Sequence, residues 1–161
     1  MTRPSVGMEI RLLADVPAAI PALAEWFHAE WHHYDGRSIA ETEAQLRDYL
    51  NRDSLPITFL ALSDSAVIGT VSLDTSDLPY YDHLSPWLAS LYVLPSRRCE
   101  GIGRALIEHL VTFALERGIS PIYLWTPVST RLYEGCGWQL LCCDVYSGRP
   151  ITLMRLALDR S

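Results

Sequence analysis

The sequence contains no lysine, so all thirteen of its Lys and Arg residues are arginines. Nineteen aspartates and glutamates outnumber them and leave a net charge of −6 at neutral pH. Proteins that bind nucleic acid neutralise phosphates with clustered Lys and Arg, so this composition argues against a nucleic-acid partner. An acidic surface suits a cationic molecule such as an amine, although it would serve solubility equally well.

Long apolar runs are missing as well. No apolar stretch approaches the roughly 20 residues that a membrane-spanning helix requires. The first ten residues, MTRPSVGMEI, lack the apolar segment of a secretory signal. We therefore expect a cytoplasmic protein that does not contact a membrane. The 161 residues match the size of a single domain, and no repeat or linker divides them, so one domain is expected over residues 1–161.

The residues that bind structural metals are few. The sequence has four cysteines, none of them in a Cys-x-x-Cys pair: Cys99, Cys136, Cys142 and Cys143. Their spacing fits neither a disulfide framework nor a zinc site, and we expect reduced thiols. His28 and His32 are spaced to share one face of a helix, but no third ligand follows at a fitting distance. No metal is expected.

What the sequence does contain is a regular alternation of strand and helix patterns. Strands are predicted at residues 9–13, 56–62, 66–73, 87–94, 121–125, 139–146 and 151–158. Helices are predicted from Asp15 as N-cap through Trp31, from Ser38 to about 51–53, over 101–117, and from Thr126 to Gly137. This order implies an α/β domain in which helices cover both faces of a mixed sheet.

The most specific motif is Arg98-x-x-Gly101-x-Gly103, placed between an apolar strand and a strong helix. Two glycines let the backbone approach a ligand closely. The unpaired N–H groups and the positive end of the helix dipole then point toward one place. An anion, and especially a diphosphate, fits such a loop.

Two other phosphate-binding motifs do not fit this segment. A Walker A loop requires Gly-Lys-Ser/Thr, and the chain has no lysine. A Rossmann fingerprint would need glycine or alanine where Leu106 stands. From this segment alone, a simple tight turn between strand and helix stays open as the alternative.

A second motif lies downstream, where Tyr133 on a short predicted helix precedes Gly137 and Trp138. Together with the glycine loop, it resembles the GNAT-type N-acetyltransferase superfamily. The resemblance is close over residues 87–141, and the order of elements resembles the fold of the family over residues 9–158. It implies a mixed central sheet of about seven strands, with helices on both faces and the fourth and fifth strands splayed around the CoA arm.

The resemblance also implies which residues bind acetyl-CoA as co-substrate. Loop amides would bind the pyrophosphate, and they belong to Arg98, Cys99, Glu100, Gly101, Ile102, Gly103, Arg104 and Ala105. The pantetheine arm would pair with backbone groups of Leu91 and Val93, and the amide near Leu91 or Tyr92 would polarise the thioester carbonyl. Further contacts with the cofactor would come from Thr126, Ser129 and Leu132.

Tyr133 corresponds to the general acid of the family, which protonates the departing CoA thiolate. A phenol with a pKa of roughly 10 is protonated at neutral pH. The glutamate that many relatives carry on the central strand would align near Ala89 or Ser90, and neither is a carboxylate. Other residues must therefore accept the proton of the amine, and the candidates are Asp82, His83, Asp74, Glu30 and His32.

In the family, the loop between the first two helices borders the acceptor pocket. We predict that Trp31, Tyr34 and Trp87 bind the acceptor, with His33 and Asp35 nearby, because aromatic rings and a carboxylate suit a cationic amine.

The expected function is acetyl transfer to a primary amine of a small, cationic molecule, by direct attack in a ternary complex. Three alternatives stay open: an acyl-CoA sensor without catalysis, transfer of a longer acyl group, and acetylation of a peptide or protein N-terminus. The final strands could pair in a homodimer.

Overall fold

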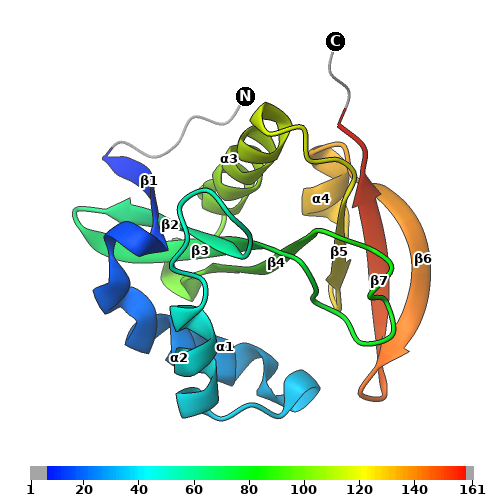
Figure 1. Cartoon of the computed structure of the whole chain (residues 1–161), viewed down its shortest axis with the longest axis horizontal. Coiled ribbons are helices and arrows are strands. Elements are labelled where there is room, and N and C mark those ends of the chain that lie inside the picture. Colours follow the sequence, from blue (N-terminus) through cyan, green and yellow to red (C-terminus); the bar gives the residue numbers. More distant parts are fainter. Residues whose placement is uncertain (1–6, 159–161) are drawn as a thin grey trace.

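The computed structural model describes residues 7–158, which form a seven-stranded mixed sheet with helices on both faces (Figure 1). The strands follow the order β1-β2-β3-β4-β5-β7-β6. Their bounds are β1 Met8–Leu12, β2 Ile57–Ser63, β3 Ala66–Asp74, β4 Trp87–Val93, β5 Ile122–Thr126, β6 Gln139–Tyr146 and β7 Arg149–Leu156. The α/β architecture expected from the sequence is confirmed.

Alternating side chains of β2 show which helices cover which face of the sheet. Phe59 and Ala61 pack in one cluster with α3, whereas Leu60 and Leu62 pack in another with α1 and α2. Figure 1 shows the same division, with α3 and α4 above the sheet and α1 and α2 below it. The helices are α1 Ile20–Asp35, α2 Ile39–Arg47, α3 Ile102–Glu116 and α4 Arg131–Gly135, with 3₁₀ turns η1 Leu13–Asp15, η2 Pro17–Ala19 and η3 Pro95–Arg97.

The first two helices form where the apolar spacing and the capping box predict them. In α2, the Ser38 hydroxyl accepts from the Glu41 amide at 3.1 Å, and the Glu41 carboxylate accepts from the Ser38 amide at 3.4 Å. The helix ends at Arg47, earlier than expected. The residues that follow form a turn instead, because the Asn51 side chain donates to the carbonyls of Asp48 and Pro56. Asp15 lies within η1 and does not cap α1, which corrects the predicted N-cap.

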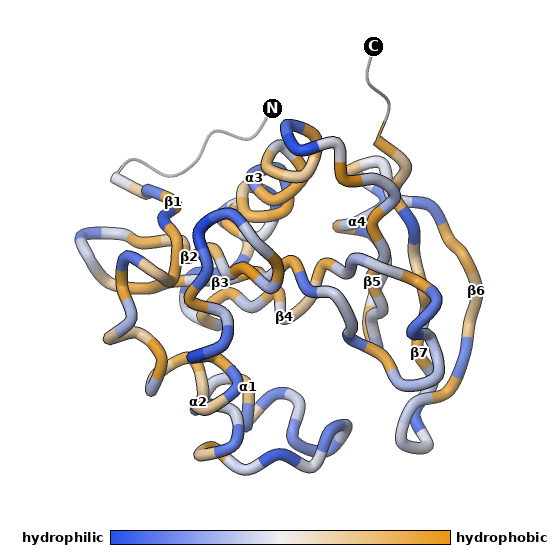
Figure 2. Tube along the Cα trace, viewed as in Figure 1, coloured by the Kyte–Doolittle hydropathy of each residue, from blue (hydrophilic) through white to orange (hydrophobic). Residues whose placement is uncertain are grey.

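Apolar residues run along the central strands and α3, while polar residues occupy the surrounding loops (Figure 2). The fourth strand, β4, lies in the middle of the sheet, as its nearly continuous apolar sequence predicts. It contacts β5 through a single bridge, Trp87 to Tyr123. Beyond this bridge the two strands diverge, which confirms the predicted splay.

The strand β4 also carries a bulge. Thr70 pairs with Tyr92 and Ser72 pairs with Ala89, so two residues of β4 oppose one of β3. Ser90, within the bulge, has a φ of 55°, a left-handed conformation that is strained for a residue other than glycine. Strain of this kind persists only where the surrounding structure enforces it. The bulge therefore marks a position at which the fold holds the backbone of β4 in a bent conformation.

The end of β5 corrects one sequence prediction. Thr126 does not cap the short helix, since it is the last residue of β5 and α4 begins only at Arg131. The Thr126 hydroxyl instead accepts from the Val128 amide at 3.3 Å and forms a local turn.

The β6–β7 turn is also tighter than predicted, because Ser147 and Gly148, with φ of 50° and 73°, make a two-residue hairpin.

Two further observations concern the cysteines and the length of the helices. The four cysteines are free thiols in this structure. Within residues 7–158, no helix has both the length and the apolar content needed to cross a bilayer.

Candidate active site

The glycine loop has the geometry of an anion-binding turn. The chain leaves β4, passes through η3, and adopts left-handed conformations at Cys99 (φ 65°) and Gly101 (φ 83°) before α3 begins. The first backbone bond of the helix joins the Ala105 amide to the Gly101 carbonyl at 3.0 Å. The amides just before it, from Ile102 to Arg104, therefore project from a helix end with a positive dipole.

The arginine side chains of this loop are bound to the protein itself. Arg98 donates to the Val93 carbonyl at 3.0 Å, and its guanidinium lies 5.6 Å from the centre of the Tyr92 ring. Arg97 forms an ion pair with Glu100 at 3.1 Å. Because these side chains are engaged, the backbone amides are the principal donors that the loop presents to an anion.

The loop is connected to the second motif. Arg104 of α3 pairs with Glu108 at 3.0 Å and donates to the Gly135 carbonyl at the end of α4 at 3.3 Å. A Cβ atom on Gly103 would lie 3.5 Å from the Leu132 side chain. The structure thus brings together two segments that are about thirty residues apart in the sequence, as the predicted cofactor site requires.

A cleft of about 530 Å³ opens between the diverging strands and α1–α2. On the side of the glycine loop it is lined by Ser90 and Leu91 of the bulge, Thr126 of β5 and Tyr133 of α4. Of the residues predicted to contact the cofactor arm, Leu91, Thr126 and Tyr133 therefore meet in one cavity. The bulge directs the backbone of β4 toward the same space.

Tyr133 is half-buried on α4, with its ring 6.3 Å from that of Trp138 in an edge-to-face arrangement. Burial raises the pKa of its phenol to about 12, with a smaller contribution from Cys136. The hydroxyl is therefore protonated throughout the neutral range, which is the state that a proton donor needs.

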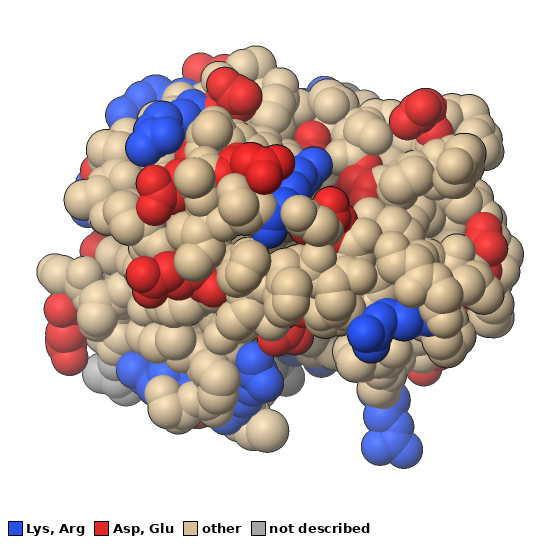
Figure 3. Space-filling model, turned by 90° about the horizontal axis from the view of Figure 1, so that it is seen from below, with Lys and Arg blue, Asp and Glu red and all other residues tan. Residues whose placement is uncertain are grey.

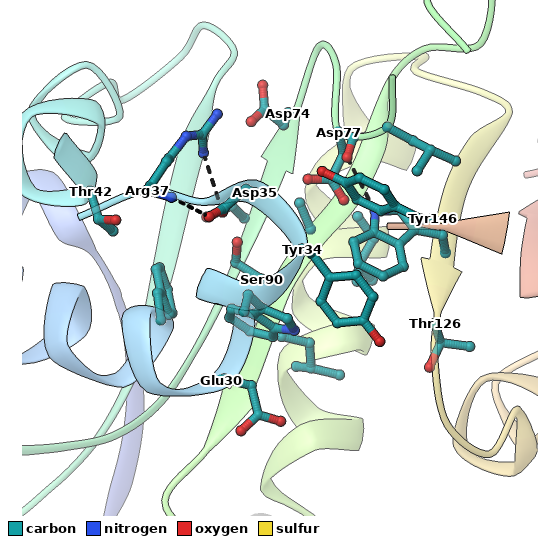
Figure 4. A pocket seen from close by; sticks show the side chains of 18 of the residues that line it. Glu30, Tyr34, Asp35, Arg37, Thr42, Asp74, Asp77, Ser90, Thr126 and Tyr146 are labelled. Atoms are coloured by element: carbon teal, nitrogen blue, oxygen red, sulfur yellow. Dashed lines mark hydrogen bonds and ion pairs between the residues drawn. The ribbon is translucent and has the colours of Figure 1, made fainter. Parts of the chain in front are cut away.

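The opposite side of the cleft is aromatic and acidic (Figure 4). Trp31 and Tyr34 line it, as predicted, whereas Trp87 does not. The Trp87 side chain is completely buried, and its indole donates to the Leu84 carbonyl at 2.7 Å. The predicted acceptor role of Trp87 is therefore wrong, because the residue belongs to the core.

Four carboxylates and one guanidinium line the cleft, namely Glu30, Asp35, Asp74, Asp77 and Arg37. Figure 3 shows this face of the molecule, with acidic side chains grouped near its centre. Arg37 forms an ion pair with Asp35 at 3.9 Å. The remaining three carboxylates give this side of the cleft an excess of negative charge.

Asp74 and Asp77 differ in their surroundings. Asp74 is buried at the end of β3, where its carboxylate accepts from the Tyr49 hydroxyl and the Thr75 amide. The pKa of Asp77 is raised well above its ordinary value, first by burial and then by the neighbouring Asp74 carboxylate. Burial and the Asp74 carboxylate thus disfavour the charged form of Asp77 in the absence of a cation.

The candidate bases fall into two groups. Asp74 and Glu30 line the cleft, but Asp82 and His83 are exposed in the loop before β4 and do not line it. The Asp82 carboxylate accepts a long bond of 3.5 Å from Ser76, and the His83 ring stacks on Tyr81 at 5.8 Å. Neither residue lines the cleft, and only Asp82 is connected to it, through this bond to the lining residue Ser76.

Sequence reasoning missed Asp77, Trp125 and Tyr146, all of which line the cleft. They come from a loop and from the ends of two strands, and no local pattern marks them. His28 and His32 stack at 4.7 Å, but among residues 7–158 no group of three metal-binding side chains is assembled.

Comparisons with known proteins agree with this geometry. The model of the GNAT acetyltransferase family matches residues 20–138. No curated protein sequence matches the chain significantly.

Solved structures with the same fold cover nearly the whole chain. A putative acetyltransferase from Salmonella typhimurium, solved with acetyl-CoA, has a TM-score of 0.76 at 22% identity, covering 96% of each chain. An aminoglycoside 6'-N-acetyltransferase complexed with coenzyme A has a TM-score of 0.74 at 16% identity, covering 95% of this chain and 99% of its own. The corresponding enzyme from Enterococcus faecium has a TM-score of 0.72 at 18% identity, with the same coverage. The family match, the splayed strands and the glycine loop lead to one conclusion: the chain belongs to the GNAT family of acetyltransferases.

Proposed function

We propose that this protein transfers the acetyl group of acetyl-CoA to a primary amine of a small, cationic molecule, by direct attack in a ternary complex. One observation carries the proposal: Tyr133 and the bulge at Ser90 and Leu91 line the same cleft as several carboxylates. One reacting centre then has access to the proton donor Tyr133, to a backbone amide of the bulge and to carboxylates that attract a cation.

The donor is bound mainly by backbone groups in this proposal. The amides at the start of α3 hold the diphosphate, and the pantetheine arm lies in the gap between β4 and β5, where the strands share a single bridge. In that position the thioester reaches the bulge of β4. Its carbonyl oxygen accepts a hydrogen bond from the Leu91 amide, which stabilises negative charge as the tetrahedral intermediate forms.

The chemical step requires two proton movements. The amine nitrogen attacks the carbonyl carbon, a C–N bond forms, and the C–S bond breaks as the intermediate collapses. Tyr133 gives its proton to the departing sulfur. The nitrogen loses a proton through water to a carboxylate of the cleft, and the candidates are Asp74 and Glu30, which line it.

The absence of a carboxylate at Ala89 and Ser90 favours one rival, an acyl-CoA sensor that does not catalyse transfer. A CoA-thiol release assay separates the two functions. Purified protein would be given acetyl-CoA with amines, amino acids, aminoglycosides and short peptides, and longer acyl-CoA thioesters would be tested as donors. Thiol release with an amine supports the enzyme. If acetyl-CoA raises the melting temperature but no acceptor releases thiol, the sensor is correct.

A further inference from the structure

An aromatic wall lies on the acceptor side of the cleft. Tyr34, Trp125 and Tyr146 come from α1, β5 and β6, and their rings meet with centroid distances of 5.3, 5.5 and 5.3 Å. All three residues line the cleft. Figure 4 shows Tyr34 and Tyr146 beside Asp77. We call them the aromatic triad. Ring faces and edges gathered in this way, at a cavity with acidic walls, suit an organic cation.

Asp77 is fixed beside the triad. Its backbone carbonyl accepts from the Trp125 indole at 3.2 Å. The next residue, Leu78, is only 4% exposed and is anchored in an apolar cluster of the sheet. These contacts hold the backbone of the β3–β4 loop at Asp77 beside the triad. Asp35 and Asp77 line the same cleft as Tyr146, and burial followed by these two carboxylates raises the pKa of the Tyr146 phenol.

The protein balances the negative charge around Asp77 only in part. Among residues 7–158, Arg37 is the only arginine that lines the cleft, and its side chain contacts Asp35 and the Gln45 side chain, the latter at 2.5 Å. Asp74 is stabilised by Tyr49. A cation bound between Asp77 and the triad would relieve the repulsion between the two neighbouring carboxylates.

The reacting nitrogen cannot be that cation. An amine attacks a thioester only when it is neutral, so at the moment of reaction it gains little from a carboxylate and an aromatic triad. The reacting end of the cleft is also marked by other residues, Ser90, Leu91 and Tyr133. The cation-binding features consequently serve a different nitrogen of the same acceptor.

We infer that the acceptor carries at least two amino groups, and that Asp77 and the aromatic triad bind the protonated one while the neutral one is acetylated. This inference rests on the proposed function and specifies its substrate class as diamines and polyamines. It also explains why the cleft is more acidic than the transfer of one acetyl group requires.

The test compares butylamine with 1,4-diaminobutane as acceptors for the intact protein with acetyl-CoA. We expect kcat/KM for the diamine to exceed that for the monoamine by about tenfold or more, as a charged hydrogen-bonded contact provides. A series of α,ω-diamines should show an optimum in chain length, because the two ends of the cleft are fixed.

Variants assign the effect to residues. Asp77→Asn should reduce the diamine preference by about tenfold or more, whereas Asp64→Asn, which removes a charge from the exposed β2–β3 turn, should retain it. Tyr146→Leu should reduce the preference by about threefold to tenfold, and Tyr146→Phe should retain it because the ring remains. Stabilisation by acetyl-CoA in a thermal shift assay would establish that each variant is folded.

The outcomes separate this inference from the proposed function. Equal kcat/KM for the two amines, or a diamine preference that survives Asp77→Asn, overturns the inference and leaves the acetyltransferase activity standing. A failure to release thiol with every amine, despite stabilisation by acetyl-CoA, overturns the proposed function and the inference with it. A preference that is lost in Asp77→Asn and kept in Asp64→Asn supports both.

Discussion

The two halves of the cleft are built in different ways. The donor half consists of the end of β4, the glycine loop and the start of α3, a continuous stretch from about 90 to 105, joined by α4. The ligand contacts proposed for it are mostly with backbone amides. The acceptor half collects side chains from α1, α2, the β3–β4 loop, β5 and β6.

The two halves of the cleft therefore differ in how much ligand recognition depends on individual side chains. Backbone amides at a helix start recognise a diphosphate whatever the neighbouring side chains are, so the donor half depends mainly on glycine positions and helix geometry. The acceptor half depends on the identity of each side chain. Changes in the two halves should therefore have separable effects on acetyl-CoA and on the amine.

The largest effect is expected at Tyr133, where the two halves meet. Tyr133→Phe should lower kcat by about 10²–10⁴-fold, the usual contribution of a positioned general acid, while the Kd for acetyl-CoA changes little. Steady-state kinetics and calorimetric titration with acetyl-CoA would measure the two quantities. Tyr80→Phe is the matched control, since Tyr80 is 93% exposed and does not line the cleft.

The pH dependence offers a second view of Tyr133. The pKa of its phenol is raised to about 12, so the group stays protonated below about pH 10. Ionisation of Tyr133 should therefore cause no decrease in wild-type kcat below that pH. A normal turnover in Tyr133→Phe, accompanied by weak binding of acetyl-CoA, would contradict the acid role and make Tyr133 a binding residue.

A smaller effect is expected in the donor half. Gly101 has a φ of 83°, so Gly101→Ala forces the turn to relax and should displace the amides at the start of α3. We expect acetyl-CoA affinity to fall by about tenfold, with a loss of about 1–2 kcal/mol in the free energy of unfolding.

The control for Gly101→Ala is Gly148→Ala in the β6–β7 turn. Gly148 has a φ of 73° and open space around the position of a Cβ atom. This variant should lose similar stability and keep its affinity for acetyl-CoA. Equal losses of affinity in both variants would show that the effect at Gly101 is general destabilisation and not a property of the loop.

In the acceptor half, Asp77→Asn should stabilise the ligand-free protein. The pKa of Asp77 is higher in the folded state than in the unfolded state. Protonated Asp77 therefore contributes stability at low pH, and this contribution is lost as the pH rises from the unfolded pKa through the folded pKa. The variant should be more stable than the wild type at pH 7, and the gain should disappear below about pH 4. Urea unfolding at several pH values would measure this, and an identical gain in Asp64→Asn would contradict the local cause.

The smallest effect concerns the capping box that begins α2. Ser38→Ala removes the acceptor of the Glu41 amide and should cost about 1 kcal/mol of unfolding free energy. Since α2 positions Thr42 and Gln45 in the cleft, KM for the amine should rise modestly while binding of acetyl-CoA stays the same. A matching change in acetyl-CoA binding would mean that the two halves are coupled.

The contrast between the halves also explains what could be predicted from the sequence. The glycine loop, Tyr133 and the β2–β3 hairpin are encoded by residues close together in the chain. The turn, helix and hairpin that contain them form where the sequence predicts them, except that α4 begins later than predicted. Trp87 was misassigned because an aromatic residue in an apolar strand has the same sequence signature whether it lines a cleft or the core.

Asp77, Trp125 and Tyr146 illustrate the limit of local patterns. Each one gains its role only when β5, β6 and the β3–β4 loop come together in the folded sheet. The bulge at Ser90 was likewise hidden, since a positive φ at serine results from pairing with β3 and not from the residue itself.

The arginines around the glycine loop have a consequence for chemical selectivity. A lysine amine held near a thioester would be a nucleophile in its own right, and it would compete with the acceptor for the acetyl group. A guanidinium remains protonated at physiological pH and does not compete. Since the sequence has no lysine, the protein can hold an activated acetyl group without offering it any side-chain amine of its own.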